Sequence, residues 1–170
     1  MRLTERAVIL VTAAVASLAP VASTAAAAAS AAPARSTAQS GTAAIGITAT
    51  IPVGSAPTGA AANPVTNTVY VVNSFDLTAS VSVISGRTNA VVATVPDGSN
   101  LYGVAVNPVI NTIYAANDSF SAVSVISGRT NTVVATVSVG FLPQGVAANP
   151  LTNTIYVADS GDNTVSVLDS

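Results

Sequence analysis

Short runs in which apolar and polar residues alternate follow one another from about residue 41 to the end of the chain. The central region shows four of them: YGVAVN (102–107), TIYAAN (112–117), AVSVIS (122–127) and TVVATVSV (132–139). A period of two is typical of β-strands, and the valine, isoleucine, threonine and tyrosine in these runs favour strands further. The pattern therefore predicts an all-β domain.

The segments between these runs have the composition of turns. NPVIN at residues 107–111 places proline where φ is about −65° and asparagine where a left-handed residue is tolerated. SGRTN follows the third run, and Gly86 and Gly128 in its two copies are expected to form the tight turn before the fourth run. Both motifs are explained by folding alone.

The same sequence motifs recur at a nearly constant spacing. NPVTNTVYVVN begins at Asn63, and its copies begin at Asn107 and Asn149, at separations of 44 and 42 residues; ISGRTN steps by 42 from Ile84 to Ile126. A period near forty with four short strands per unit predicts β-propeller blades. The first run of each unit is rich in glycine, alanine and valine, as expected for inner strands that converge on an axis. The tyrosines of the second runs, Tyr70, Tyr114 and Tyr156, are expected to pack between blades.

The first 44 residues are of a different kind. Arg2 and Arg6 precede an apolar run at residues 7–19 that ends before Pro20 and is followed by many alanines. We interpret residues 1–32 as a cleaved signal peptide, with cleavage at one of several alanines between 22 and 32. A membrane anchor is the alternative, but the run is shorter than the ~18 residues that a span needs. Residues 33–44 are an Ala/Ser-rich linker, and residues 45–170 are the repeat domain, which we expect to be secreted and extracellular, or periplasmic.

The charge balance and the missing residue types exclude several classes of function. After residue 32 the chain has three arginines, six aspartates and no lysine, which argues against a nucleic-acid partner. It has no histidine or cysteine, and its one glutamate is Glu5, so no catalytic triad or metal-ligand cluster can be assembled. We predict a protein that is not an enzyme and has no cofactor. A propeller hydrolase or lyase with a metal held by aspartates is an alternative. DSGDN at residues 159–163 lacks the spacing of a calcium loop, so no metal site is predicted.

Several landmarks in register carry a resemblance to a known family. VYVVN, IYAAN and IYVAD, followed by VSVIS or VSVLD and then by TVVATV, resemble the YVTN β-propeller repeat family of surface-layer and other exported proteins. The resemblance covers about residues 45–170. It implies a binding or scaffolding role and no catalytic residue. The chain departs from the family in having Val72, Ala116 and Ala158 at the threonine position, and in its small number of repeats.

The repeats add up to three blades. Residues 47–53 align with the fourth run of the central unit when shifted by 86 residues, with Thr50 on Thr136 and Gly54 on Gly140. If this segment is an orphan fourth strand, the chain holds twelve strands, and residues 47–53 and 165–168 present unpaired edges. Three blades cannot close a ring. Either the sequence is a piece of a longer propeller, or two copies join head to tail as a homodimer, each completing the last blade of the other.

The blade topology sorts the loops into two ends. The loops between the second and third strands and those between successive blades share one end, and we interpret that end as a binding face for an unknown protein or glycan, because loops carry function and exposed aromatic residues supply contact area. Arg87 and Arg129 map to the opposite end. The predicted binding residues are Phe75, Asp76, Asp97, Tyr102, Asp118, Phe120, Phe141, Asp159 and Asp162. The alternative is that these aspartates cap turns and the phenylalanines tuck between blades.

Overall fold

The computed structural model describes residues 46–74, 79–98 and 100–169. Residues 45–170 form one compact unit. Phe75 and Asp76, the predicted signal peptide and the predicted linker lie outside the described residues. No helix within the described part is long and apolar enough to cross a membrane.

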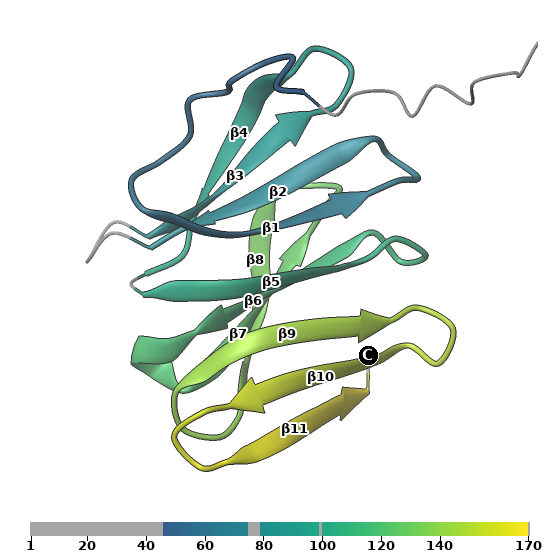
Figure 1. Ribbon diagram of the computed structural model, residues 1–170. Coiled ribbons are helices and arrows are strands. Elements are labelled where there is room, and N and C mark those ends of the chain that lie inside the picture. Colours follow the sequence, from purple (N-terminus) through teal and green to yellow (C-terminus); the bar gives the residue numbers. More distant parts are fainter. Residues whose placement is uncertain (1–45, 75–78, 99, 170) are drawn as a thin grey trace, which may run out of the picture. The chain divides into compact units, whose positions relative to one another are not determined.

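The unit consists of three antiparallel sheets, each a simple meander of consecutive strands (Figure 1). The first sheet contains β1 (Pro57–Asn63), β2 (Thr68–Asn73), β3 (Ser80–Ser85) and β4 (Ala90–Pro96). The second contains β5 (Leu101–Asn107), β6 (Thr112–Asn117), β7 (Ala122–Ser127) and β8 (Thr132–Ser138), with a single 3-10 turn, η2 (Asp118–Phe120), between β6 and β7. The third contains β9 (Pro143–Asn149), β10 (Thr154–Asp159) and β11 (Thr164–Asp169). The four-strand repeat predicted from the sequence is confirmed.

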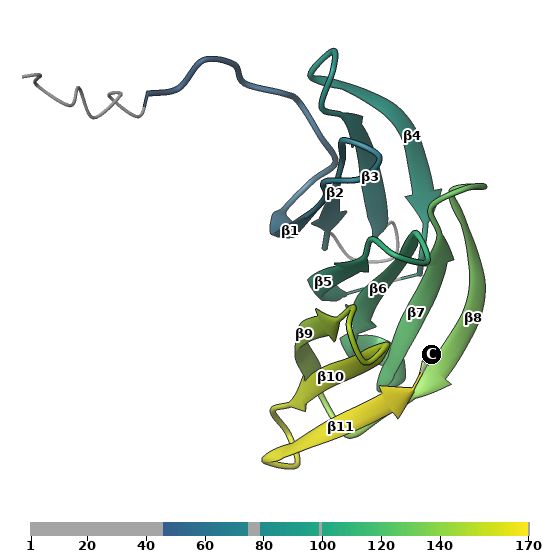
Figure 2. The same cartoon turned by 90° about the vertical axis from the view of Figure 1, so that its right-hand side faces the viewer.

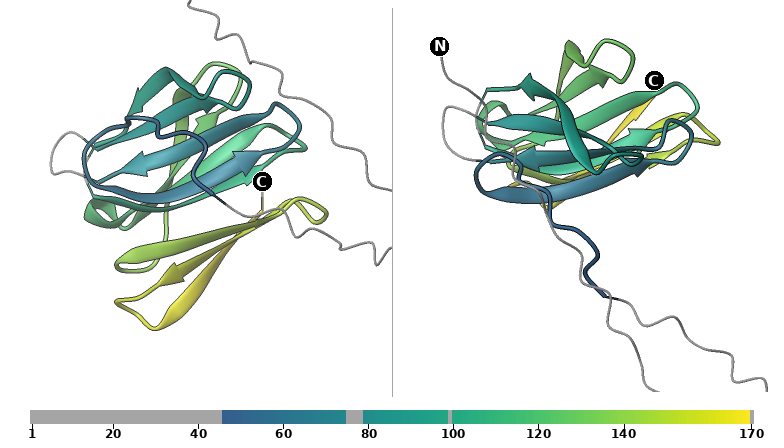
Figure 3. Two further views of the ribbon diagram at one scale, coloured as in Figure 1. Left: turned by 45° about the horizontal axis from the view of Figure 1, so that its top comes forward. Right: turned by 90° about the horizontal axis from the view of Figure 1, so that it is seen from above.

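The sheets follow one another with corresponding strands aligned. Among the first strands, β5 contacts both β1 and β9 along one side, and the fourth strands β4 and β8 lie on the other side (Figure 2). Figure 3 shows the sheets from two further directions, with the β9–β10–β11 sheet at the end of the row. We call the sheets blade 1, blade 2 and blade 3 in chain order.

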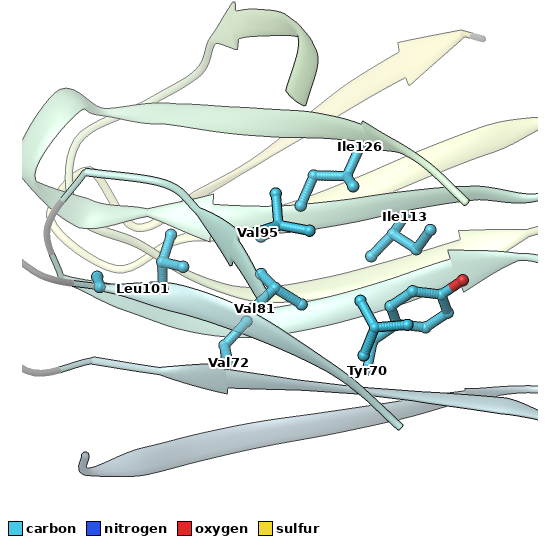
Figure 4. Packing of buried hydrophobic residues seen from close by; sticks show 10 residues of the cluster. Tyr70, Val72, Val81, Val95, Leu101, Ile113 and Ile126 are labelled. Atoms are coloured by element: carbon cyan, nitrogen blue, oxygen red, sulfur yellow. The ribbon is translucent and has the colours of Figure 1, made fainter. Parts of the chain in front are cut away.

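The apolar core lies between the blades. Tyr70 of blade 1 belongs to one buried cluster with Ile113 of blade 2, and the two side chains lie next to each other in Figure 4. Tyr114 of blade 2 belongs to a second cluster with Ile155 of blade 3. Burial between sheets is the main stabilising contribution in this architecture, because the described residues contain no disulfide. Packing of the second-strand tyrosines is therefore confirmed for Tyr70 and Tyr114.

The third tyrosine departs from the expectation. Tyr156 is 42% exposed, whereas Tyr70 and Tyr114 are buried. Its position in β10 is the same as theirs in β2 and β6, so the difference comes from its surroundings. Within the described residues no fourth blade covers its side of blade 3.

The predicted orphan strand at residues 47–53 is wrong for the isolated chain. These residues pair with no described strand, so the described residues form eleven strands and not twelve. A β-strand needs a partner for its backbone hydrogen bonds. Within the described residues β11, the third strand of blade 3, has no fourth strand beside it. Blade 3 lies at the other end of the row from β1.

Gly86 and Gly128 lie in the tight turns predicted for them, but they do not supply the left-handed residue. The left-handed residues of the turns between third and fourth strands are Asn89 and Asn131, with φ of 51° and 55°, and not Gly86 and Gly128. Glycine is required there for a different reason, since a Cβ on Gly86 or Gly128 would collide with the asparagine of the neighbouring turn, Asn67 or Asn111. The left-handed asparagines predicted between first and second strands are confirmed at Asn67, Asn111 and Asn153.

Candidate binding face

Two kinds of loop meet at one end of the blades. The loop that enters a blade contacts the loop between the second and third strands of that same blade, as shown by the hydrogen bonds from Asp118 N to Asn100 O and from Ser160 N to Leu142 O, both 3.0 Å long. Figure 1 shows the β6–β7 and β10–β11 loops at one end and the β5–β6 and β9–β10 turns at the other. We call the first end the loop face; its described segments in blades 2 and 3 are residues 97–98, 100, 118–121, 139–142 and 160–163.

Asp97 lies at the blade 2 part of the loop face and points inward. Its Oδ1 accepts a 2.7 Å hydrogen bond from Ser124 Oγ, and its backbone oxygen accepts one from Asn117 Nδ2 at 3.3 Å. Its Oδ2 is buried with no partner among the described residues. Burial raises the pKa of Asp97 to about 6, against an ordinary value of 3.8, and the Ser124 hydrogen bond lowers it in part. Asp97 therefore links the loop to the blade and does not offer a free charge to a partner.

Phe120 stands over the same loop. It is the last residue of η2, and a Cβ on Gly98 would come within 2.9 Å of its ring. The ring is nevertheless 64% exposed, because only one side rests on the glycine backbone. Asp118, in the same turn, is half-buried. Phe120 is thus held from below and presents its other side to solvent.

A similar arrangement recurs in the loops of blade 3. The backbone N–H of Phe141 donates a 2.6 Å hydrogen bond to Oδ2 of Asp162, and the N–H of Gly161 donates to the carbonyl of Phe141 at 2.9 Å. A Cβ on Gly161 would overlap the Phe141 ring. The ring is 54% exposed, and the side chain of Asp162 is exposed as well. The loop face therefore carries a second exposed phenylalanine, with an aspartate beside it.

Asp159 and Tyr102 differ from the other predicted residues. Asp159 is buried, and its Oδ2 accepts hydrogen bonds from both the backbone N–H and the hydroxyl of Ser166, at 3.1 and 2.6 Å. This carboxylate stabilises blade 3 and is not accessible to a macromolecular partner. Tyr102 is partly exposed, but it lies on strand β5, in a hollow with Gly59 and Gly145, and not in a loop.

Burial and repetition identify a structural position at the end of each second strand; of its three residues only Asp159 was predicted as a site residue, and as a binding residue. Asn73, Asn117 and Asp159 occupy the last position of β2, β6 and β10, and all three are buried. Asn73 Nδ2 donates to Ser82 Oγ at 3.0 Å, as Asp159 accepts from Ser166. The available indication was the set of repeated three-residue motifs VNS, AND and ADS, each with VSV in the strand that comes next. This hydrogen bond holds the start of the loop in blades 1 and 3, whereas in blade 2 Asn117 Nδ2 and Ser124 Oγ both donate to Asp97.

The opposite end of the blades carries the positive charge. Arg87 and Arg129 lie in the turns after β3 and β7 and are exposed. Within the described residues there is no group of three or more His, Cys, Asp or Glu side chains that could hold a metal ion.

Solved structures of other proteins contain a similar arrangement of sheets. The sequence matches no protein-family model and no curated protein. The structure is similar to a chain of hydrazine synthase from Kuenenia stuttgartiensis, with a TM-score of 0.62 and 26% identity over 68% of this chain and 33% of that one. It is also similar to the β-propeller domain of Cps50 (Swd1) from Myceliophteria thermophila, with a TM-score of 0.60 and 14% identity over 73% of this chain and 38% of that one. The chain contains β-propeller blades. It spans roughly a third of the length of these solved chains.

Proposed function

We propose that the chain is an exported, non-enzymatic β-propeller module that binds a protein or a glycan through the loop face. The observation that carries the proposal is that Phe120 and Phe141 are both largely exposed although each rests against the glycine of a neighbouring loop. Exposed aromatic side chains on a rigid support bury much area on binding at a low cost in conformational entropy. The YVTN-like repeats, typical of surface-layer and other exported proteins, are consistent with this role.

The charge of the loop face indicates the chemistry of the partner. Asp162 is exposed beside Phe141, and Asp118 is half-exposed in the turn that ends with Phe120. No arginine or lysine lies in the described loops of this face. A ligand that combines an apolar or aromatic surface with positive charge would complement it, as would a sugar ring stacked on phenylalanine.

Binding should be tested on two arrays, one of synthetic peptides that vary in lysine, arginine and aromatic content and one of glycans. The double variant Phe120→Ala/Phe141→Ala should lose at least tenfold in affinity for any probe that the unmodified chain binds. The matched control, Arg87→Ala/Arg129→Ala, alters exposed residues at the opposite end and should bind as before. Equal loss in both variants would contradict the assignment of the loop face.

The non-enzymatic part of the proposal needs its own measurement. Turnover should be assayed on sugars, lactones and glycans with and without added divalent cations. We expect none. A turnover that disappears in Asp118→Ala while the variant stays folded would favour the metal-dependent alternative.

A further inference from the structure

Three contacts recur between successive blades, and each is left open on the far side of blade 3. The first is the packing of the second-strand tyrosine. Tyr70 and Tyr114 are buried against the next blade, while Tyr156 lies at a hollow of ≈ 290 Å³ on the free side of blade 3. The hollow is lined by Gly145, Val146, Ala147, Tyr156, Ala158 and Val165. We call the surface formed by these six residues and Val167 the docking face.

The second contact is a hydrogen bond between asparagines. Asn63 Nδ2 donates to Asn111 Oδ1 at 2.8 Å, and Asn107 Nδ2 donates to Asn153 Oδ1 at 2.7 Å. In both cases the donor ends the first strand of one blade and the acceptor lies in the turn of the next. Asn149 occupies the donor position in blade 3, and the corresponding acceptor position is that of Asn67 in blade 1.

The third contact is the close approach of the inner strands. A Cβ on Gly59 would come within 2.7 Å of Tyr102 O, and a Cβ on Gly103 would overlap Gln144 O. Glycine is needed at both positions because the next inner strand passes there. Gly145 occupies the same position in blade 3, yet its nearest neighbour would be Ala158 Cβ at 3.5 Å. Gly145 therefore leaves room for the close approach of a further inner strand, which the described residues do not supply.

Among the described residues blade 3 has no fourth strand, and the fourth strand of blade 2 is less covered than that of blade 1. Val95 of β4 is 1% exposed, whereas Val137, at the same position of β8, is 36% exposed. Val95 belongs to the cluster between blades 1 and 2. Blade 3 has no described strand beyond β11 that could cover Val137 in the same way.

The chain itself carries a segment that fits this gap. Ala56 has a φ of 49° and its carbonyl accepts from Ser74 N at 3.0 Å, as Leu142, with a φ of 53°, accepts from Ser160 N. Residues 54–56 thus have the geometry of the loop that enters a blade, although no described strand precedes them. Residues 47–53, which come before that loop, occupy the sequence position of a fourth strand.

We propose that the docking face and the free edge of β11 bind blade 1 of a second copy of the chain, and that residues 47–53 of that copy add the fourth strand to blade 3. The surface of blade 1 that would contact the docking face of the other copy is itself incompletely covered. Val69 and Val71 are half-buried there, whereas their counterparts Ile155 and Val157 in blade 3 are fully buried against blade 2. The two surfaces are thus the two halves of one repeating interface.

The number of blades supports two copies. Propellers close with about four to eight blades. Two copies with three blades each give a ring of six with twofold symmetry, in which both copies use the same pair of surfaces. The three recurring contacts and the added strand are then all satisfied at both junctions.

The existing pairing predicts the register of the added strand. Val137 lies opposite Val123 in blade 2, and Pro96 lies opposite Ser80 in blade 1. The equivalent pairs place Ile51 of the second copy opposite Val165, and Pro52 opposite Thr164. Pro52 thus falls at the position that Pro96 occupies at the end of β4, where an outer strand tolerates proline.

The first test is the mass of the purified chain in solution, measured by light scattering over a range of concentrations. We expect a discrete dimer. Val165→Asp, an exposed position on the docking face, should give a monomer with an unchanged circular dichroism spectrum. Val65→Asp alters a still more exposed valine in the turn after β1 and should leave the dimer intact. A monomer at every concentration, or a polydisperse series of larger masses, would overturn the proposal.

The second test reports the register and does not depend on a destabilising variant. The chain has no cysteine, so Ile51→Cys/Val165→Cys introduces the only pair. Directly opposed residues in a sheet are close enough for a disulfide, and mild oxidation should give a covalent dimer on non-reducing gels. In Ile47→Cys/Val165→Cys the two positions are offset by four residues, about 13 Å along the strand, which is too far to bridge. Equal cross-linking of both pairs, or of neither, would refute the predicted strand addition.

Discussion

Asn107 donates a hydrogen bond from Nδ2 to Oδ1 of Asn153, and its own Oδ1 accepts one from the N–H of Val109. One side chain thus holds the turn that follows its strand and ties blade 2 to blade 3. Asn63 does the same between blades 1 and 2. The asparagine of the NP motif is therefore an inter-blade contact as well as a turn residue.

Asn107→Ala is expected to cost more stability than Asn149→Ala. Asn149 Oδ1 accepts the hydrogen bond from Leu151 N within its turn, but no described blade lies beyond it to which its Nδ2 could donate. Asn107→Ala should lower the free energy of unfolding by about 2 kcal/mol and Asn149→Ala by about 1 kcal/mol, since a hydrogen bond contributes roughly 1 kcal/mol. Urea unfolding in the Val165→Asp background, where no second copy binds, measures the difference. Equal losses would show that the contact between blades adds nothing.

The tyrosines provide a second matched pair. Tyr70→Ala should lower the free energy of unfolding by about 3 kcal/mol or more, because it leaves a cavity between blades 1 and 2. Tyr156→Ala removes the same side chain from an uncovered position and should cost about 0.5 kcal/mol in the same Val165→Asp background. Thermal unfolding followed by circular dichroism gives both values. A large loss for Tyr156→Ala would mean that its surface is covered within one copy.

The stability of the domain should fall as the pH rises from about 4 to 6. Burial raises the pKa of Asp97 to about 6, so the folded chain binds this proton more tightly than the unfolded chain does, and the stabilisation is lost as the carboxyl ionises. Asp97→Asn should remove this dependence and raise stability at pH 7 by on the order of 1 kcal/mol, a value discounted for solvent screening at a partly exposed group. Ser124 Oγ can still donate to the amide oxygen of the variant.

Urea unfolding at pH 4, 5, 6 and 7 tests this expectation. Asp169→Asn, at an exposed residue that ends β11, is the control and should leave the profile unchanged. A profile for Asp97→Asn that matches the unmodified chain would show that Asp97 does not control this pH range.

Much of the fold follows from local pattern. Alternation of apolar residues gave the strands, and the spacing of Asn63, Asn107 and Asn149 gave the repeat, because each blade is built from the same short-range preferences. The placement of Asp97, Asp118 and Asp162 near one end also followed, since consecutive antiparallel strands fix the end at which each loop lies. These conclusions need only the order of elements along the chain.

Burial could not be deduced in this way, because it depends on which surface lies opposite. Tyr70 and Tyr156 have similar local sequences, yet only Tyr70 is covered by a following blade. Asp159 and Asp162 both lie near the β10–β11 loop, but only contact with Ser166 shows that Asp159 belongs to the interior. Residues 47–53 have the pattern of a strand and pair with nothing described, since a strand forms only where a free edge is within reach. The sequence by itself determined the blades and their order, and the tertiary structure decided which of their surfaces are covered.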